Sequence, residues 1–136
     1  MNNVTLIAFG FGWMVVAAIL GLFLGAKHEV HLGGLAKAAF DNNLLRYHEE
    51  LERFKWRSSV HAHGMLFALS SVAIGVMLPR TGLEPLAIRI IIAAVMALTI
   101  AWTLAALWRF RPVMAIADIA FTVVLVVISG SLVLIH

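Results

Sequence analysis

Cysteine is absent from the 136 residues, tyrosine occurs once, proline occurs three times, and only 12% of the residues are charged. The lack of cysteine excludes disulfides, iron–sulfur clusters held by thiolates, and cysteine nucleophiles. A metal or cofactor therefore has to be held by histidine, carboxylate, methionine, tyrosine or backbone groups. Hydrophobic residues make up 62% of the chain. A water-soluble domain of this composition would expose large apolar patches, so we expect the protein to reside in a lipid bilayer.

Four long apolar runs divide the chain. They span about residues 4–26, 59–79, 86–108 and 112–135. Each run is close to the roughly 20 residues that a helix needs to cross the hydrocarbon core of a membrane. Pro79 ends the second run, and Pro112 opens the fourth, where proline suits the first turn of a helix. The sequence thus predicts an all-α fold, an integral membrane four-helix bundle that residues 1–136 form as a single domain.

The basic residues predict how the bundle is oriented. Six lie between the first and second runs, and Arg109 and Arg111 lie between the third and fourth, so eight of the ten share one side. The positive-inside rule places that side in the cytoplasm and both termini outside. We predict a multi-pass protein of a bacterial-type inner membrane. Because topology accounts for the net charge of +3, no nucleic-acid partner is expected.

The segment between the first two runs has its own helical pattern. Its sequence is LAKAAFDNNLLRYHEELERFKW, in which Leu44, Leu51 and Phe54 form an apolar stripe. We expect a helix on the cytoplasmic membrane interface that runs on into the second membrane helix. Gly33 and Gly34 are expected to break the chain after the first helix; in the alternative, the first helix extends into the cytoplasm.

Two histidines, His61 and His63, lie a short way inside the second run, in the stretch VHAHG. On a regular helix their rings point about 200° apart and cannot easily bind one metal ion. An extended segment would place both rings on one side. The face of His61 continues through Gly64, Ala68 and Ser71. These small residues leave room either for a flat cofactor or for the backbone of a neighbouring helix.

One carboxylate lies inside the fourth run. Asp118 is about six residues from the cytoplasmic end of that run, at a depth similar to that of His61 and His63. An ionisable group in a bilayer is costly unless it faces the bundle and finds a partner. We expect Asp118 to pair with one of the two histidines, as a carboxylate does behind a metal-ligating imidazole. For both histidines, packing or hydrogen bonding at the interface is the alternative.

Three more histidines lie at the same interface. His28 and His31 are one turn apart in KHEVH, and His48 is four residues before Glu52. Imidazole and carboxylate ligands suit iron, zinc or copper, and imidazole alone can ligate haem iron. We therefore expect haem b or a copper, iron or zinc ion. The candidate cofactor ligands are His61, His63, His28 and His31, and the candidate metal ligands are His61, His63, Asp118 and His48.

The stretch VHAHGMLFALSSVAIGVMLP resembles the HxH helices of NnrS-type haem–copper membrane proteins and of distant relatives of the oxidase catalytic subunit. Such histidines ligate haem or metal in those families, which implies the same role for His61 and His63. The resemblance covers about 20 of the 136 residues. The leading hypothesis is a haem- or metal-binding membrane protein with a redox role or a role in a membrane redox complex.

The overall layout is similar to that of the MAPEG family of trimeric membrane glutathione transferases. The stretch ERFKWRSSVHAHG supplies two arginines, but His61 and Gly64 stand where that family has Asn and Glu. The resemblance implies an oligomeric, glutathione-dependent enzyme. Its anion-binding residues would be Arg53, Arg57, Arg109 and Arg111. A third hypothesis is a non-catalytic small subunit. In all three cases the partners are the lipid bilayer and either copies of this chain or other membrane subunits.

Overall fold

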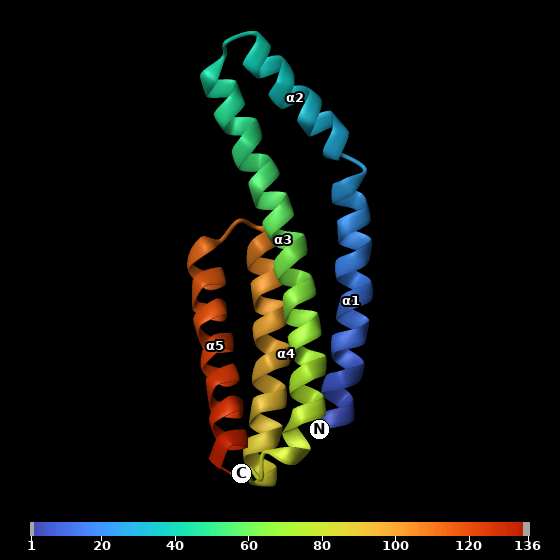
Figure 1. Ribbon diagram of the computed structural model, residues 1–136, viewed down its shortest axis with the longest axis vertical. Coiled ribbons are helices and arrows are strands. Elements are labelled where there is room, and N and C mark those ends of the chain that lie inside the picture. Colours follow the sequence, from blue (N-terminus) through green and yellow to red (C-terminus); the bar gives the residue numbers. More distant parts are fainter. Residues whose placement is uncertain (1, 135–136) are drawn as a thin grey trace.

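A computed structural model describes residues 2–134 as helices joined by short turns (Figure 1). The helices are α1 (Asn3–Gly25), α2 (His28–Phe40), α3 (Leu44–Met77), α4 (Pro85–Leu107) and α5 (Arg111–Leu134), with a short 3-10 helix, η1 (Leu78–Arg80), after α3. Four of them, α1, α3, α4 and α5, are long and apolar enough to cross a membrane. The all-α prediction is confirmed. Each predicted apolar run falls in one of these four helices to within two residues at its ends, and residue 135 of the fourth run lies outside the described residues.

The segment between the first two apolar runs forms a pair of helices. Figure 1 shows α2 and the first half of α3 extending beyond the α4–α5 turn along the long axis of the bundle. The 34 residues of α3 give it a length of about 50 Å, well beyond the roughly 30 Å of a hydrocarbon core. The expected break at Gly33 and Gly34 is wrong. Both glycines lie inside α2, which packs on α3, and the chain turns instead at Ala26 and Lys27.

We call the end of the bundle that carries α2 and the α4–α5 turn the basic end. At this end α3 begins at a polar cap. The side chain of Asn43 accepts a hydrogen bond from the backbone N–H of Arg46 at 3.1 Å, which starts α3 next to α2. At the far end of the bundle Asn2 caps α1 in the same way, accepting from Thr5 at 3.0 Å. Pro85 opens α4, where its missing N–H leaves no hydrogen bond unmade.

Two helices at the basic end terminate through a residue in the left-handed region. Asn42, with φ of 51°, follows α2, and Arg109, with φ of 57°, follows α4. After α4 the N–H of Arg109 donates to Ala106 and the N–H of Phe110 donates to Ala105, a Schellman arrangement. Asparagine tolerates this conformation, whereas a long side chain in a sparsely populated region costs about 1–3 kcal/mol.

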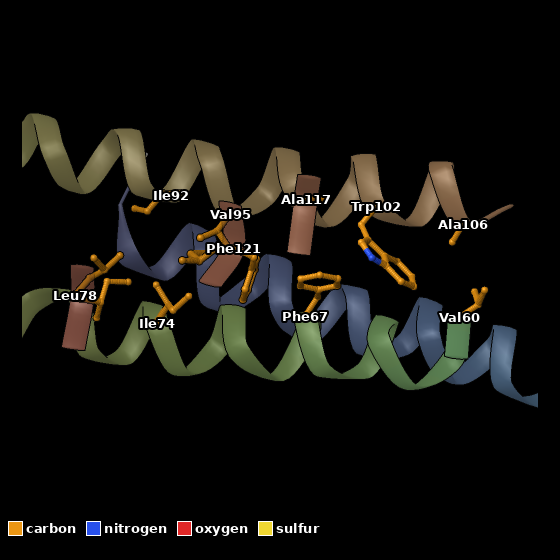
Figure 2. Packing of buried hydrophobic residues seen from close by; sticks show 12 residues of the cluster. Val60, Phe67, Ile74, Leu78, Ile92, Val95, Trp102, Ala106, Ala117 and Phe121 are labelled. Atoms are coloured by element: carbon orange, nitrogen blue, oxygen red, sulfur yellow. The ribbon is translucent and has the colours of Figure 1, made fainter. Parts of the chain in front are cut away.

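An aromatic layer ties α3, α4 and α5 together. Figure 2 shows Phe67 of α3 between Trp102 of α4 and Phe121 of α5. The ring centroid of Phe67 lies 5.5 Å from that of Trp102 and 4.6 Å from that of Phe121. Trp102 is only 1% exposed. Ile74 of α3 and Val95 of α4 belong to the same buried cluster, which fixes the rotation of α3 in the bundle.

Small residues line the opposite side of α3, where it meets α1. A Cβ atom added at Gly10 would lie 2.9 Å from the carbonyl oxygen of Ala68, and one added at Gly64 would lie 3.5 Å from the Cβ of Ala17. Backbone approach of this kind is typical of small-residue seams between membrane helices. The small face that begins at His61 is therefore a packing seam. The backbone of α1 occupies the space considered for a flat cofactor.

Candidate functional site: a histidine cavity between α1, α2 and α3

A cavity of about 180 Å³ lies at the basic end, where α1 ends and α2 begins beside α3. Its polar lining consists of His28 and His31 from α2 and of Arg57, Ser58 and His61 from α3. The side chains of Leu24 and Phe54 and the backbone of Gly21 and Gly25 complete the wall. The fold thus brings together three of the four histidines predicted as cofactor ligands. We call this hollow the histidine cavity.

The ring of His61 is held against α1. Its Nδ1–H donates to the carbonyl oxygen of Ala17 at 3.1 Å, and this oxygen is an acceptor only, so the proton of the neutral ring is placed on Nδ1. The ring also lies over Gly21, where an added Cβ would collide with it. Because Nδ1 is engaged, Nε2 of His61 keeps its lone pair for a ligand.

His31 is oriented in the same manner, by a carboxylate. Its Nδ1 lies 3.3 Å from Oε2 of Glu50, and the two side chains are 14% and 19% exposed. Arg53 approaches the other carboxylate oxygen of Glu50 at 3.7 Å. A carboxylate behind an imidazole fixes the tautomer and leaves Nε2 as the ligating nitrogen. Nε2 of His31 is buried and has no hydrogen-bond partner among the described residues.

A second polar group of the histidine cavity is also buried without a partner. Nη1 of Arg57 is buried, and within the described part of the chain it has no hydrogen-bond partner. A buried donor left in this state costs about 1–3 kcal/mol. His28 is exposed at the rim, where its ring centroid lies 5.2 Å from that of Phe54. The cavity therefore combines imidazole lone pairs with a guanidinium that lacks an acceptor.

His63, the fourth predicted cofactor ligand, lies elsewhere. Its ring stacks on Trp102, with centroids 4.9 Å apart and planes at 12°. Its Nδ1–H donates to the carbonyl oxygen of Ser59, one turn earlier, at 2.9 Å. His61 thus contacts α1 while His63 contacts α4, as the divergence of an HxH pair on a regular helix predicts. The two rings do not share a metal ion in this arrangement.

The four predicted metal ligands are not brought together. His48 lies in a separate hollow near the α4–α5 turn, and His61 and His63 face different helices. Within residues 2–134 the carboxylate of Asp118 makes no hydrogen bond or ion pair with either of these two histidines, so the expected pairing is absent there. No three His, Asp or Glu side chains of the described chain lie close enough to hold a metal ion by themselves.

The four predicted anion-binding arginines divide between two places. Arg53, Arg109 and Arg111 line a hollow of about 370 Å³ between α3 and the α4–α5 turn, together with Trp56. Arg57 lies in the histidine cavity instead. The two residues are one turn apart on α3, and Arg57 lines the cavity together with Phe54, Ser58 and His61 of the same helix.

Two residues that contact the histidine rings of the cavity, Glu50 and Gly21, were not predicted from the sequence to do so. Glu50 belongs to a run of acidic residues that reads as a solvated helix face, and nothing in the run distinguishes it from Glu49 or Glu52. Gly21 forms a GxxxG match with Gly25, a signal for close helix approach that does not specify a histidine as the neighbour. Both roles depend on how α1 and α2 pack against α3.

Comparisons of the chain with protein-family models, with curated proteins and with solved structures found no match. The resemblances of the HxH stretch and of the four-helix layout stay predictions.

Proposed function

We propose that this chain is an integral membrane protein whose basic end faces the cytoplasm. Four helices of sufficient length and apolar character support the membrane location. The orientation is supported by the eight basic residues at the basic end, against two at the other. In this placement the histidine cavity lies near the cytoplasmic membrane surface, where the first half of α3 leaves the bundle.

We propose further that the histidine cavity binds a transition-metal ion and that the protein serves a membrane redox system. The observation that supports this most is that the rings of His31 and His61 are oriented in the same way. Each ring engages Nδ1 with an oxygen acceptor, and both rings line one cavity. Imidazole nitrogens oriented in this way are the usual ligands of copper, zinc and iron.

The size of the cavity favours a single ion over haem b. Pockets for small organic ligands measure about 300–1,000 Å³, and the histidine cavity measures about 180 Å³. The α1–α3 seam below it is closed by contacts such as that of Gly64 with Ala17, so a haem ring would have to separate two packed helices.

Arg57 indicates what completes the coordination. Two imidazoles leave positions open on the ion, and the unpaired guanidinium lies in the same cavity. An anionic or oxygen ligand on the metal would accept hydrogen bonds from Arg57 and offset the repulsion between the two cations. We therefore propose a metal ion that carries such a ligand on the side of Arg57.

The test is metal binding by the detergent-purified protein. After chelation and dialysis, copper(II) and zinc(II) are titrated by calorimetry, and bound metal is counted by elemental analysis. We expect about one ion per chain, with binding lost in His31→Ala and in His61→Ala. His63→Ala and His48→Ala are the matched controls, because their rings lie outside the histidine cavity. Equal loss in all four variants, or no binding by the native chain, would contradict the proposal.

A second candidate is a small subunit of a larger membrane complex, and the outer face of α5 favours it. Thr122 and Ser129 are exposed on this helix and line a shallow apolar groove with Gly130. Asp118 precedes them on the same face, and no partner for its carboxylate is found in residues 2–134. Polar groups on a lipid-facing helix are costly, and a neighbouring helix would remove that cost. Crosslinking in membranes before detergent extraction tests this candidate, and an uncrosslinked monomer would contradict it.

A further inference from the structure

The hollow between α3 and the α4–α5 turn has a charge arrangement that the metal proposal leaves unexplained. The guanidinium groups of Arg109 and Arg111 both lie 5.8 Å from the ring centroid of Trp56, which projects from α3. Arg53 lines the same hollow, whose volume is about 370 Å³. We call it the indole–arginine hollow. Two cations thus lie close to one indole ring, and a third lines the same hollow.

Carboxylates of the chain do not neutralise the two arginines of the turn. In the part of the chain that the structure describes, neither Arg109 nor Arg111 makes an ion pair. Glu49 and Glu52 also line the hollow, and Glu52 is itself paired with Lys55 at 3.7 Å. Guanidinium groups in such a setting suit a phosphate, whose oxygens accept paired hydrogen bonds.

The backbone of the α4–α5 turn supports a binding role for Arg109. This residue adopts φ of 57° at a position that glycine or asparagine fills most readily, and Asn42 fills the equivalent position after α2. A strained residue kept at such a position is a reason to look for a function of its side chain. Here the side chain reaches Trp56, and glycine would remove both the strain and the guanidinium.

The surroundings indicate a lipid rather than a soluble phosphate. Trp108 and Phe110 alternate with the two arginines along the turn and are largely exposed. Together with Leu104 and Val113 they line an apolar groove of about 490 Å³ on α4 and α5. Hence the turn offers cationic side chains to a headgroup and an apolar groove to acyl chains. Clusters of arginine beside membrane helices attract anionic lipids at the cytoplasmic surface.

We propose that the indole–arginine hollow binds the phosphate of an anionic phospholipid, with Arg109 and Arg111 as its donors and Trp56 as the surface that holds them. This proposal rests on the membrane location proposed above and is independent of the metal site. The lipid anchors the α4–α5 turn to the first half of α3, the segment that extends beyond the bundle.

The test measures thermal unfolding of the detergent-purified chain with added phosphatidylglycerol or with phosphatidylcholine at the same mole fraction. Native mass spectrometry counts the lipid that stays bound. We expect phosphatidylglycerol to raise the unfolding midpoint and to remain bound, and phosphatidylcholine to do neither. Arg109→Gly should unfold no earlier than the native chain without lipid, because glycine suits the backbone there, yet it should lose most of the phosphatidylglycerol response.

Two further variants distinguish lipid binding in the indole–arginine hollow from a general electrostatic attraction between the basic protein and an anionic lipid. Arg111→Gln should also lose most of the response, and it keeps the test decisive if the glycine variant folds poorly. Arg89→Gln, which removes a charge at the opposite end of the bundle, should keep all of it. Equal responses to the two lipids, or an undiminished response in both Arg109→Gly and Arg111→Gln, would overturn the lipid site.

Soluble anions supply the remaining control. Inorganic phosphate, glycerol phosphate and glutathione are added at millimolar concentration to the same samples. We expect no rise in the unfolding midpoint, and a rise equal to that with phosphatidylglycerol would overturn the lipid assignment. The membrane location is tested separately by alkaline extraction of membranes, in which a chain that leaves the membrane fraction contradicts the proposed function rather than the hollow alone.

Discussion

The imidazole of His61 lies against the backbone of Gly21, in the space that any side chain at position 21 would take. Gly21→Ala should therefore push the ring off its hydrogen bond with Ala17 and lower metal affinity by about 10–100-fold, the usual effect of losing a group that orients a ligand. The forced overpacking should also destabilise the protein by about 1–3 kcal/mol. Metal titration and thermal unfolding measure the two effects.

The chain offers two matched controls for Gly21→Ala. A Cβ at Gly12 meets no atom within 4 Å, so Gly12→Ala should change neither property. Gly10→Ala collides with Ala68 and Val72 far from the histidines, so it should lower stability and spare metal affinity. If Gly10→Ala and Gly21→Ala weaken metal binding equally, the effect comes from the α1–α3 seam as a whole and His61 has no special role.

Glu50 should matter to the metal site although it does not line the histidine cavity. Its carboxylate orients His31 at 3.3 Å, and Glu50→Gln removes the charge while keeping the size of the side chain. We expect metal affinity to fall by about 10–100-fold, the range for groups that support a ligand. Glu49→Gln is the neighbouring control, because Glu49 is exposed and contacts no histidine of the cavity. Calorimetric titration of copper(II) compares the variants, and an unchanged affinity in Glu50→Gln would rule out the orienting role.

His63 should behave as a packing residue. Its ring stacks on the buried Trp102, so His63→Phe, which keeps an aromatic ring, should retain stability and metal content. His63→Ala should lower the free energy of unfolding by about 0.5–1.5 kcal/mol, the value of an aromatic pair beyond simple burial. Chemical unfolding in mixed micelles gives this difference. Loss of bound metal in His63→Phe would restore the ligand role that the HxH pattern predicts for this residue.

The sequence predicted the four apolar helices, the divergence of His61 and His63, and the gathering of His28 and His31 near His61, because each follows from composition or helical period. The predicted pairing of Asp118 with His61 or His63 is not found in residues 2–134. Depth along a helix can be counted from the sequence, but the rotation of α5 is decided by Phe121 and Ala117, which turn toward α3 and α4. The roles of Glu50 and Gly21 could not be predicted from the sequence either, because they arise from contacts between α1, α2 and α3.

A substitution at Asp118 distinguishes the carboxylate–histidine pair expected from the sequence from the structure, in which that pair is absent. Its carboxylate contacts neither His61 nor His63 in the described chain, so Asp118→Leu should leave metal affinity unchanged. The same variant should abolish crosslinking if the outer face of α5 docks against another helix, as the second candidate function requires. Metal content and crosslinking are measured on one preparation. A loss of metal would bring back the carboxylate–imidazole pair predicted from the sequence.

The absence of cysteine makes the orientation of the chain directly measurable, because any introduced thiol is the only one present. Asp41→Cys places it in the exposed turn between α2 and α3, and Glu84→Cys places it at the start of α4, at the opposite end of the bundle. Neither side chain makes an ion pair within residues 2–134, so both substitutions should fold. With the basic end in the cytoplasm, a membrane-impermeant maleimide should label position 84 in intact cells and position 41 only after lysis. The reverse pattern would place the histidine cavity and the indole–arginine hollow on the outer surface, and the unlabelled native chain shows that the signal comes from the introduced thiols.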